Sequence, residues 1–168
     1  MILLNGRGQL GEELKKLISR EFPIEIYHTW NYKDKSFSKQ KEEYEKYINF
    51  LEDDIYHRPS NKVVFISSTN HGPNPYTYFK REACKITEKE ISYLIIRLPN
   101  LIGPGVLDKM IHSDTYTEGV INYTTVKKAA AFVYNSAMSH ENTTITCPSE
   151  PISVSNLKSI IQYVKNET

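Results

Sequence analysis

Tyr76 and Lys80 have the types and the spacing of an acid–base pair. One turn of helix would place both side chains on the same face. A nearby ammonium group favours the phenolate form of tyrosine and lowers its pKa, so the pair could move a proton to or from a hydroxyl group. The chain contains 12 tyrosines, so a chance pair with a solvated lysine is the alternative interpretation.

Hydroxyl side chains come just before this pair, where an apolar run ends. Ser67, Ser68 and Thr69 follow residues 63–66, which are β-branched and aromatic and predict a central strand. Ligands of open parallel sheets bind at the carboxyl ends of the strands, so a hydroxyl there could hold a substrate oxygen. Bonding of these side chains to their own loop is the alternative. His71, in the same loop, is a candidate ligand or base and more simply a loop residue.

A glycine-rich turn opens the chain, between a short apolar run and a segment with helical spacing of leucine. Its G-x-G-x-x-G pattern permits a tight turn, and the free N–H groups of a helix N-terminus bind a pyrophosphate. The pattern predicts a dinucleotide site made of Gly6, Arg7, Gly8, Gln9, Leu10 and Gly11. A ligand-free turn between a strand and a helix would look the same.

The second half of this fingerprint is missing. A carboxylate about 20 residues further on normally ends the next strand and binds the ribose hydroxyls. Here the alternating segment 24–28 runs into Thr29 and Trp30, with neither an acid nor an arginine for a 2′-phosphate. Trp30 could stack on a ring, although core or lid packing is the simpler expectation. The sequence does not decide between NAD and NADP.

Composition excludes several classes of function. A net charge of +1 over 168 residues favours neither nucleic acid nor an anionic membrane. No apolar stretch approaches the ~18 residues of a membrane span. The two cysteines, Cys84 and Cys147, and the scattered histidines lack metal-ligand spacing, so we expect no metal and a reducing, cytoplasmic compartment.

Strand-like and helix-like segments alternate along the chain. Further strands are predicted at 93–98 and 143–146, and further helices at 38–56, 76–88 and 125–138. This alternation predicts a single α/β domain over residues 1–168, with an open, mostly parallel sheet and helices on both faces.

Together these segments resemble the extended short-chain dehydrogenase/reductases, the NAD-dependent epimerase/dehydratase family that modifies nucleotide sugars. Residues 1–11 look most like the dTDP-4-dehydrorhamnose reductase branch, and residues 63–69 look like the strand with the catalytic hydroxyl. Residues 74–80 are similar to the Tyr-x-x-x-Lys element, including its proline. Residues 95–105 resemble the segment that borders the nicotinamide and the substrate. Later segments continue the resemblance over almost the whole chain.

The resemblance implies a Rossmann-like fold and an NAD- or NADP-dependent epimerase or reductase that acts on a nucleotide sugar in surface polysaccharide synthesis. Tyr76 would be the general acid or base, Lys80 would lower its pKa and bind the nicotinamide ribose, and Ser68, or else Thr69, would orient the substrate oxygen. Besides the glycine turn, the cofactor would be bound by Ser67, Lys80, Leu98, Pro99 and Asn100. The substrate would be bound by Asn70, His71, Arg97 and Asn100.

The resemblance also implies a homodimer, formed through the helices at 38–56 and 76–88. Tyr44 and Tyr47 lie on an apolar stripe of the first helix, which would suit such an interface.

The chain is shorter than the family it resembles. One strand–helix unit is expected to be missing between Arg20 and Ser38. Segment 24–30 then corresponds to the family's third strand, the second strand with its ribose-binding acid is absent, and the right-handed crossover rule is preserved. The region 104–168, which resembles the substrate region, is reduced. The alternative function is therefore a non-catalytic relative that has lost cofactor or substrate binding and acts as an interaction or regulatory module. A dinucleotide sensor without turnover is a third interpretation.

Overall fold

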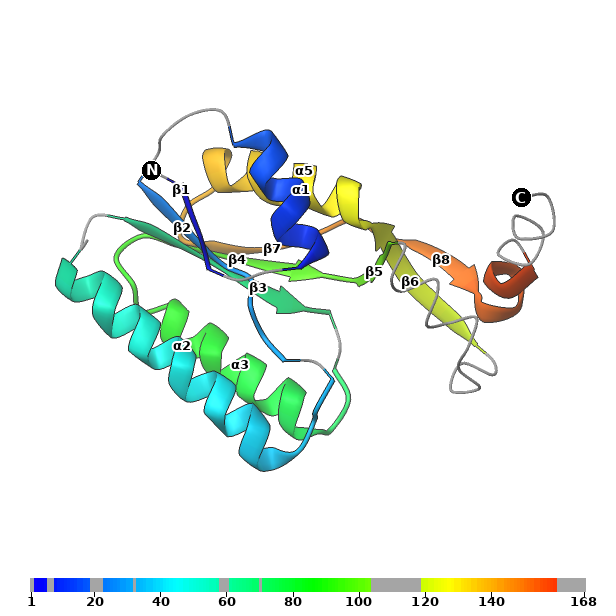
Figure 1. Ribbon diagram of the computed structural model, residues 1–168, viewed down its shortest axis with the longest axis horizontal. Coiled ribbons are helices and arrows are strands. Elements are labelled where there is room, and N and C mark those ends of the chain that lie inside the picture. Colours follow the sequence, from blue (N-terminus) through cyan, green and yellow to red (C-terminus); the bar gives the residue numbers. More distant parts are fainter. Residues whose placement is uncertain are drawn as a thin grey trace.

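A five-stranded parallel sheet forms the centre of the molecule, in the order β1-β2-β3-β4-β7. The computed structural model describes residues 2–5, 8–18, 23–31, 33–57, 61–69, 71–103 and 119–159. The strands of this sheet are, in chain order, Ile2–Asn5, Ile24–Tyr27, Lys62–Ser68, Tyr93–Leu98 and Thr143–Thr146. The expected Rossmann-like sheet with helices on both faces is confirmed (Figure 1).

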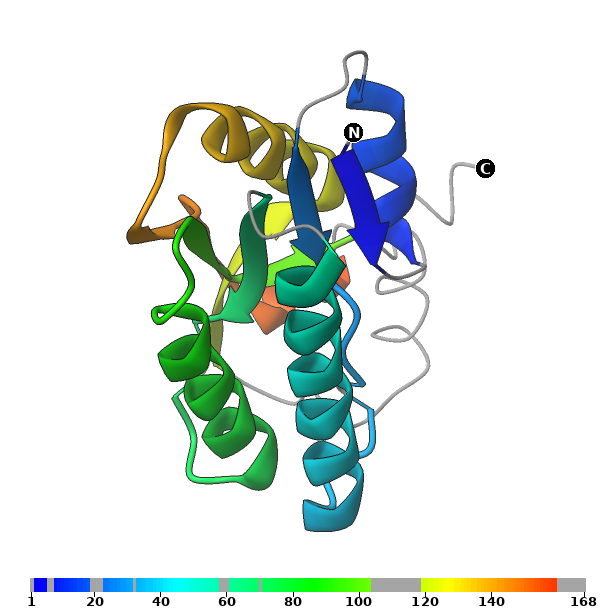
Figure 2. The same cartoon turned by 90° about the vertical axis from the view of Figure 1, so that its left-hand side faces the viewer.

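Two pairs of helices cover the two faces of this sheet (Figures 1 and 2). Helices α1 (Gln9–Leu17) and α5 (Val126–Ser139) lie on one face, over a core that includes Val64 and Ile96. Helices α2 (Phe37–His57) and α3 (Pro75–Thr87) lie on the other, over a mainly aromatic core. Burial on both faces explains why the central strands are continuous apolar runs in the sequence.

A second, three-stranded sheet lies beyond the carboxyl end of β4 (Figure 1). It consists of β5 (Asn100–Ile102), β6 (Val120–Thr125) and β8 (Glu150–Ser153). Thr125 caps α5, because its side chain accepts a hydrogen bond from the Lys128 N–H at 3.2 Å. Residues 104–118 and 160–168 of the expected substrate region lie outside the described residues.

The place of β2 in the sheet corrects one prediction. Dinucleotide-binding sheets usually have the strand order 3-2-1-4-5-6. Here β2 lies between β1 and β3, where the fourth strand of that order would be, so segment 24–30 does not correspond to the third strand. Two strands of the usual order thus lack a counterpart among the described residues, and β1 forms the edge of the described sheet.

The first crossover corrects a second prediction. The chain steps from β1 to β2 to β3 in one direction across the sheet, yet α1 and α2 lie on opposite faces. The two crossovers therefore have opposite hands: β2–α2–β3 is right-handed, as is usual, and β1–α1–β2 is left-handed (Figures 1 and 2). Helix α1 keeps this face because its buried Leu10 and Leu14 share a core with α5.

Tyr47 does not belong to an exposed stripe on α2. Its side chain is fully buried, and its hydroxyl group lies 2.6 Å from Thr87 Oγ1 on α3. Tyr44 is half-buried against Phe79. A homodimer through α2 and α3 stays a prediction, and any such interface would not include the Tyr47 side chain.

Candidate active site

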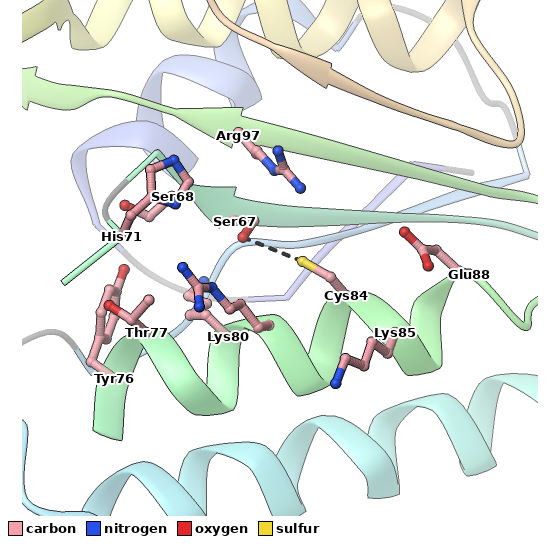
Figure 3. Close-up of a pocket in the computed structure, with 11 residues that line it drawn as sticks. Ser67, Ser68, His71, Tyr76, Thr77, Lys80, Cys84, Lys85, Glu88 and Arg97 are labelled. Atoms are coloured by element: carbon pink, nitrogen blue, oxygen red, sulfur yellow. Dashed lines mark hydrogen bonds between the residues drawn. The ribbon is translucent and has the colours of Figure 1, made fainter. Parts of the chain in front are cut away.

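Tyr76 and Ser68 come together at the carboxyl edge of the sheet. Asn74 caps α3 by accepting a hydrogen bond from the Thr77 N–H at 3.0 Å, which starts the helix at Pro75 and puts Tyr76 in its first turn. Ser68 ends β3, and its side chain is hydrogen-bonded to that of Tyr76. The hydroxyl pair that the sequence predicted is therefore assembled (Figure 3).

The electrostatics of Tyr76 differ from the prediction. Burial raises the pKa of the phenol, and the Ser68 hydrogen bond opposes that shift only in part. Lys80 does not contribute to lowering it, and its Nζ lies 6.0 Å from the centre of the Tyr76 ring. The prediction that Lys80 lowers the pKa of Tyr76 is thus wrong for this structure, and Tyr76 is a neutral phenol at neutral pH.

Lys80 is enclosed by its own protein. Its Nζ donates a hydrogen bond to the Ile66 carbonyl oxygen at 2.6 Å and lies 4.6 Å and 4.7 Å from the ring centres of Trp30 and Phe65. Only 7% of the residue is exposed. Burial lowers the pKa of this amine to about 7. The lysine expected to bind a ribose is therefore directed into the core.

Trp30 is fixed over Lys80 by the first turns of α2. The indole Nε1 donates to Gln40 Oε1 at 2.8 Å, and Gln40 Nε2 donates to the carbonyl oxygens of Asn31, at 2.7 Å, and Asp34. The Asn31 N–H donates to Glu43 Oε2 at 3.1 Å. Moving the indole away from Lys80 would therefore break its hydrogen bond to Gln40, a side chain that is itself held in place by this buried network.

A hollow of about 240 Å³ lies between the carboxyl ends of β3 and β4 and helix α3 (Figure 3). It is smaller than the ~300–1,000 Å³ usual for ligand pockets, so it suits a small ligand. Six residues predicted from the sequence line it: Ser67, Ser68, His71, Tyr76, Lys80 and Arg97. Others on α3 were missed: Thr77, Arg81, Cys84, Lys85 and Glu88. Thr77, Arg81 and Lys85 follow one another at intervals of four residues, and Cys84 and Glu88 continue the same interval from Tyr76 and Lys80. This helical spacing could have predicted them.

The glycine turn lies on the opposite face of the sheet, at the start of α1. Gly8 has a φ of 138°, which favours glycine, and a Cβ there would meet no atom within 4 Å. The Gln9 side chain reaches Gly103, whose added Cβ would lie 2.5 Å from Gln9 Oε1. Leu10 and Gly11 are buried. Gly6 and Arg7 lie outside the described residues.

The remaining predicted residues form the connection between β4 and the second sheet. Leu98 and Pro99 are buried, and the Leu98 carbonyl oxygen accepts a hydrogen bond from the Thr69 N–H at 3.0 Å. Asn100 is exposed, and its Nδ2 donates to the Asn122 carbonyl oxygen at 3.1 Å. Asn70 lies outside the described residues. The first contact joins the ends of β3 and β4, the second joins β5 to β6, and Asn100 is left accessible.

The residues present do not fit a complete nicotinamide dinucleotide. The glycine turn and the start of α1 suit a phosphate group. However, the Nζ of Lys80 is occupied by the Ile66 carbonyl oxygen and covered by Trp30. Within the described sheet, no strand lies beyond β1 to supply the acid that binds the adenosine ribose.

Three other features bear on the kind of site. In the described part of the chain, no three His, Cys, Asp or Glu side chains are grouped as metal ligands. Cys84 and Cys147 are free thiols. None of the described helices combines the length and the apolar character needed to cross a membrane.

We expect Gly8→Ala to lower the free energy of unfolding by about 1–3 kcal/mol, because its backbone lies in a region that only glycine populates readily. Urea denaturation would measure the loss. Gly72→Ala is the control, since Gly72 lacks a positive φ and its Cβ would meet only the Asn74 side chain, at 3.2 Å. Equal losses at both positions would contradict the strain assigned to Gly8.

Comparison with known proteins shows the fold. No protein-family model matches the sequence, and no curated protein matches it significantly. Among solved structures, a hypothetical dTDP-4-dehydrorhamnose reductase from Sulfolobus tokodaii aligns over 96% of this chain, with a TM-score of 0.69 and 16% identity. An ADP-L-glycero-D-manno-heptose-6-epimerase from Helicobacter pylori aligns over 89%, with a TM-score of 0.64 and 14% identity. A UDP-glucose 4-epimerase from Thermus thermophilus, in complex with NAD, aligns over 92%, with a TM-score of 0.65 and 13% identity.

The chain therefore shares the fold of nucleotide-sugar epimerases and reductases. The alignments cover 81% of the Sulfolobus protein, 60% of the Helicobacter protein and 65% of the Thermus protein. At these identities the likeness carries the fold alone, and residue roles must come from the site itself.

Proposed function

We propose that this chain is a Rossmann-like binding module with the fold of nucleotide-sugar epimerases and reductases, but without a working nicotinamide dinucleotide site. It binds a small polar ligand in the hollow beside Ser68 and Tyr76 and serves as an interaction or regulatory module. The observation that carries this proposal is the enclosure of Lys80 by Trp30, Phe65 and the Ile66 carbonyl oxygen.

The energetics favour the closed arrangement. A ribose could reach Lys80 Nζ only if Trp30 left its place, which would break the hydrogen bond to Gln40 and expose an indole that is 9% accessible. A ligand shifts such an equilibrium only by its differential affinity for the open form. Here the described sheet ends at β1, so the adenosine half lacks the contacts that would repay this opening.

Calorimetric titration with NAD, NADH, NADP and NADPH tests the proposal. We expect no saturable binding to the wild-type chain at millimolar cofactor. Gly8→Trp is the matched control, because it would block the turn where a pyrophosphate would bind. Micromolar binding by the wild type that is lost in Gly8→Trp would overturn the proposal.

A second candidate function is an NAD(P)-dependent epimerase or reductase of nucleotide sugars, in surface polysaccharide synthesis. The hydrogen bond between Ser68 and Tyr76 favours it, because a neutral phenol so oriented can donate a proton to a keto oxygen. Turnover of a sugar nucleotide that disappears in Tyr76→Phe would establish this candidate. Turnover that survives in Tyr76→Phe would exclude the role of Tyr76.

A further inference from the structure

The hollow continues along α3, past the Ser68–Tyr76 pair, to a region that the proposed function does not use. Ser67 on β3 and Arg97 on β4 are register partners, and both point to the α3 side of the sheet (Figure 3). Cys84 on α3 meets them there, with its Sγ 3.4 Å from Ser67 Oγ. On its other side, Arg97 is paired in the sheet with Thr146 on β7.

Among the described residues, the side chains that line this hollow carry more positive than negative charge. Arg81 and Arg97 line the hollow, and neither forms an ion pair or a side-chain hydrogen bond in the described part of the chain. Lys85 differs, because its Nζ is paired with Glu82 at 2.7 Å. The single acid among the lining residues is Glu88. Two guanidinium groups that have no partner among the described residues thus line a hollow that is open to a ligand.

The Cys84 thiol shows that several of these charges converge on one place. Burial raises the pKa of the thiol, while the Ser67 hydrogen bond and the positive charges of Lys80 and Arg97 lower it. Glu88 acts in the opposite direction. The thiol lines the same hollow as Arg97 and its pKa responds to the charge of Arg97, so it can report on an anion that binds there.

We propose that this end of the hollow is an oxyanion site, in which Arg97 and Arg81 bind the phosphate or carboxylate group of a small polar ligand. Guanidinium groups form paired, charge-assisted hydrogen bonds with both kinds of group. The Ser67 hydroxyl lies beside this position as a further donor. The rest of the ligand extends along α3 towards Ser68 and Tyr76. This inference rests on the proposed function for the pocket and adds the charge class of its ligand.

The volume of the hollow limits the size of the ligand to which the phosphate or carboxylate group belongs. At about 240 Å³ it has room for a body of roughly monosaccharide size and is too small to enclose a dinucleotide. The site also lies on the α3 face, across the sheet from the glycine turn and α1. An anion bound at Arg97 is therefore distinct from a pyrophosphate at Gly8.

Anion titration with substituted chains tests the site. The probes are inorganic phosphate and acetate, added to the wild type, Arg97→Met, Arg81→Met and Lys89→Met, with binding followed by NMR shifts. Lys89 is the control because it is exposed and does not line the hollow. We expect saturable binding of at least one anion, at least tenfold weaker in the two arginine variants and unchanged in Lys89→Met. The stronger anion decides between phosphate and carboxylate.

Alkylation of Cys84 gives a second readout that does not depend on the arginine variants folding normally. Bound anion should slow the reaction of Cys84 with iodoacetamide in the wild type, while Cys147, which is 3% exposed, serves as the internal reference. Equal affinity in wild type and Arg97→Met, or no saturable binding of either anion, would overturn the inference. Dinucleotide binding together with anion binding at Arg97 would overturn only the proposed function.

Discussion

Trp30→Ala is expected to lower the free energy of unfolding by about 3–5 kcal/mol, the usual cost of removing a buried tryptophan. The side chain is 9% exposed, and its ring lies 5.9 Å from that of Phe65 and 6.5 Å from that of Tyr47. Its removal leaves Gln40 Oε1 without its donor and uncovers Lys80. The loss therefore combines a cavity with an unsatisfied buried acceptor.

Chemical denaturation of Trp30→Ala and Trp30→Phe would separate these contributions. Trp30→Phe keeps an aromatic ring near Lys80 but cannot donate to Gln40, so it should be the milder of the two. Ile91→Ala is the control, because Ile91 is 84% exposed and should change stability by less than about 0.5 kcal/mol. A Trp30→Ala chain as stable as the control would mean that Trp30 does not close the site.

Trp30→Ala also tests whether Trp30 encloses Lys80, which is the observation behind the proposed function. In Trp30→Ala, water reaches Lys80, so the pKa of the amine should rise from about 7 towards its ordinary value. NMR of the lysine Cε or Nζ resonance would follow it. An unchanged titration midpoint would show that Phe65 and the Ile66 carbonyl oxygen enclose Lys80 without the indole.

The elements and the hydroxyl pair were predictable because their signals are local. Apolar runs such as residues 63–66 give buried parallel strands whatever lies beside them. The position of Ser68 at a strand end and of Tyr76 in the next helix already brings them to the same edge of the sheet. The sequence therefore predicted that these two side chains would meet.

The order of strands was not predictable in this way, because periodicity within a segment says nothing about its neighbours. The alternating pattern of segment 24–28 predicts a strand, but it is the same whether that strand lies at the third or the fourth position of the usual order. Its position decides the hand of the first crossover and makes β1 the edge of the described sheet. The state of Lys80 depends on that position too, because β2 brings Trp30 alongside β3 and α3.

Replacing Lys80 by methionine is expected to stabilise the chain at pH 6 and to lose this advantage as the pH rises. The folded chain holds the pKa of Lys80 at about 7, below the ordinary value of 10.5. Between these values the unfolded chain carries a proton that the folded chain lacks, so wild-type stability rises with pH by up to about 1.4 kcal/mol per unit. Below pH 7 both states are protonated and the cost of burying the ammonium is fully present.

The difference between wild type and Lys80→Met isolates this amine, because all other titrations cancel. Urea denaturation from pH 6 to pH 9 should show two stability profiles that converge as the pH rises, whereas Lys89→Met, at an exposed position, should run parallel to the wild type. Parallel profiles for Lys80→Met would mean that the ammonium keeps its ordinary pKa in the folded chain. Lys80 would then be solvated and free to meet a ligand, which is the arrangement that a dinucleotide enzyme requires and that the contact with Trp30 argues against.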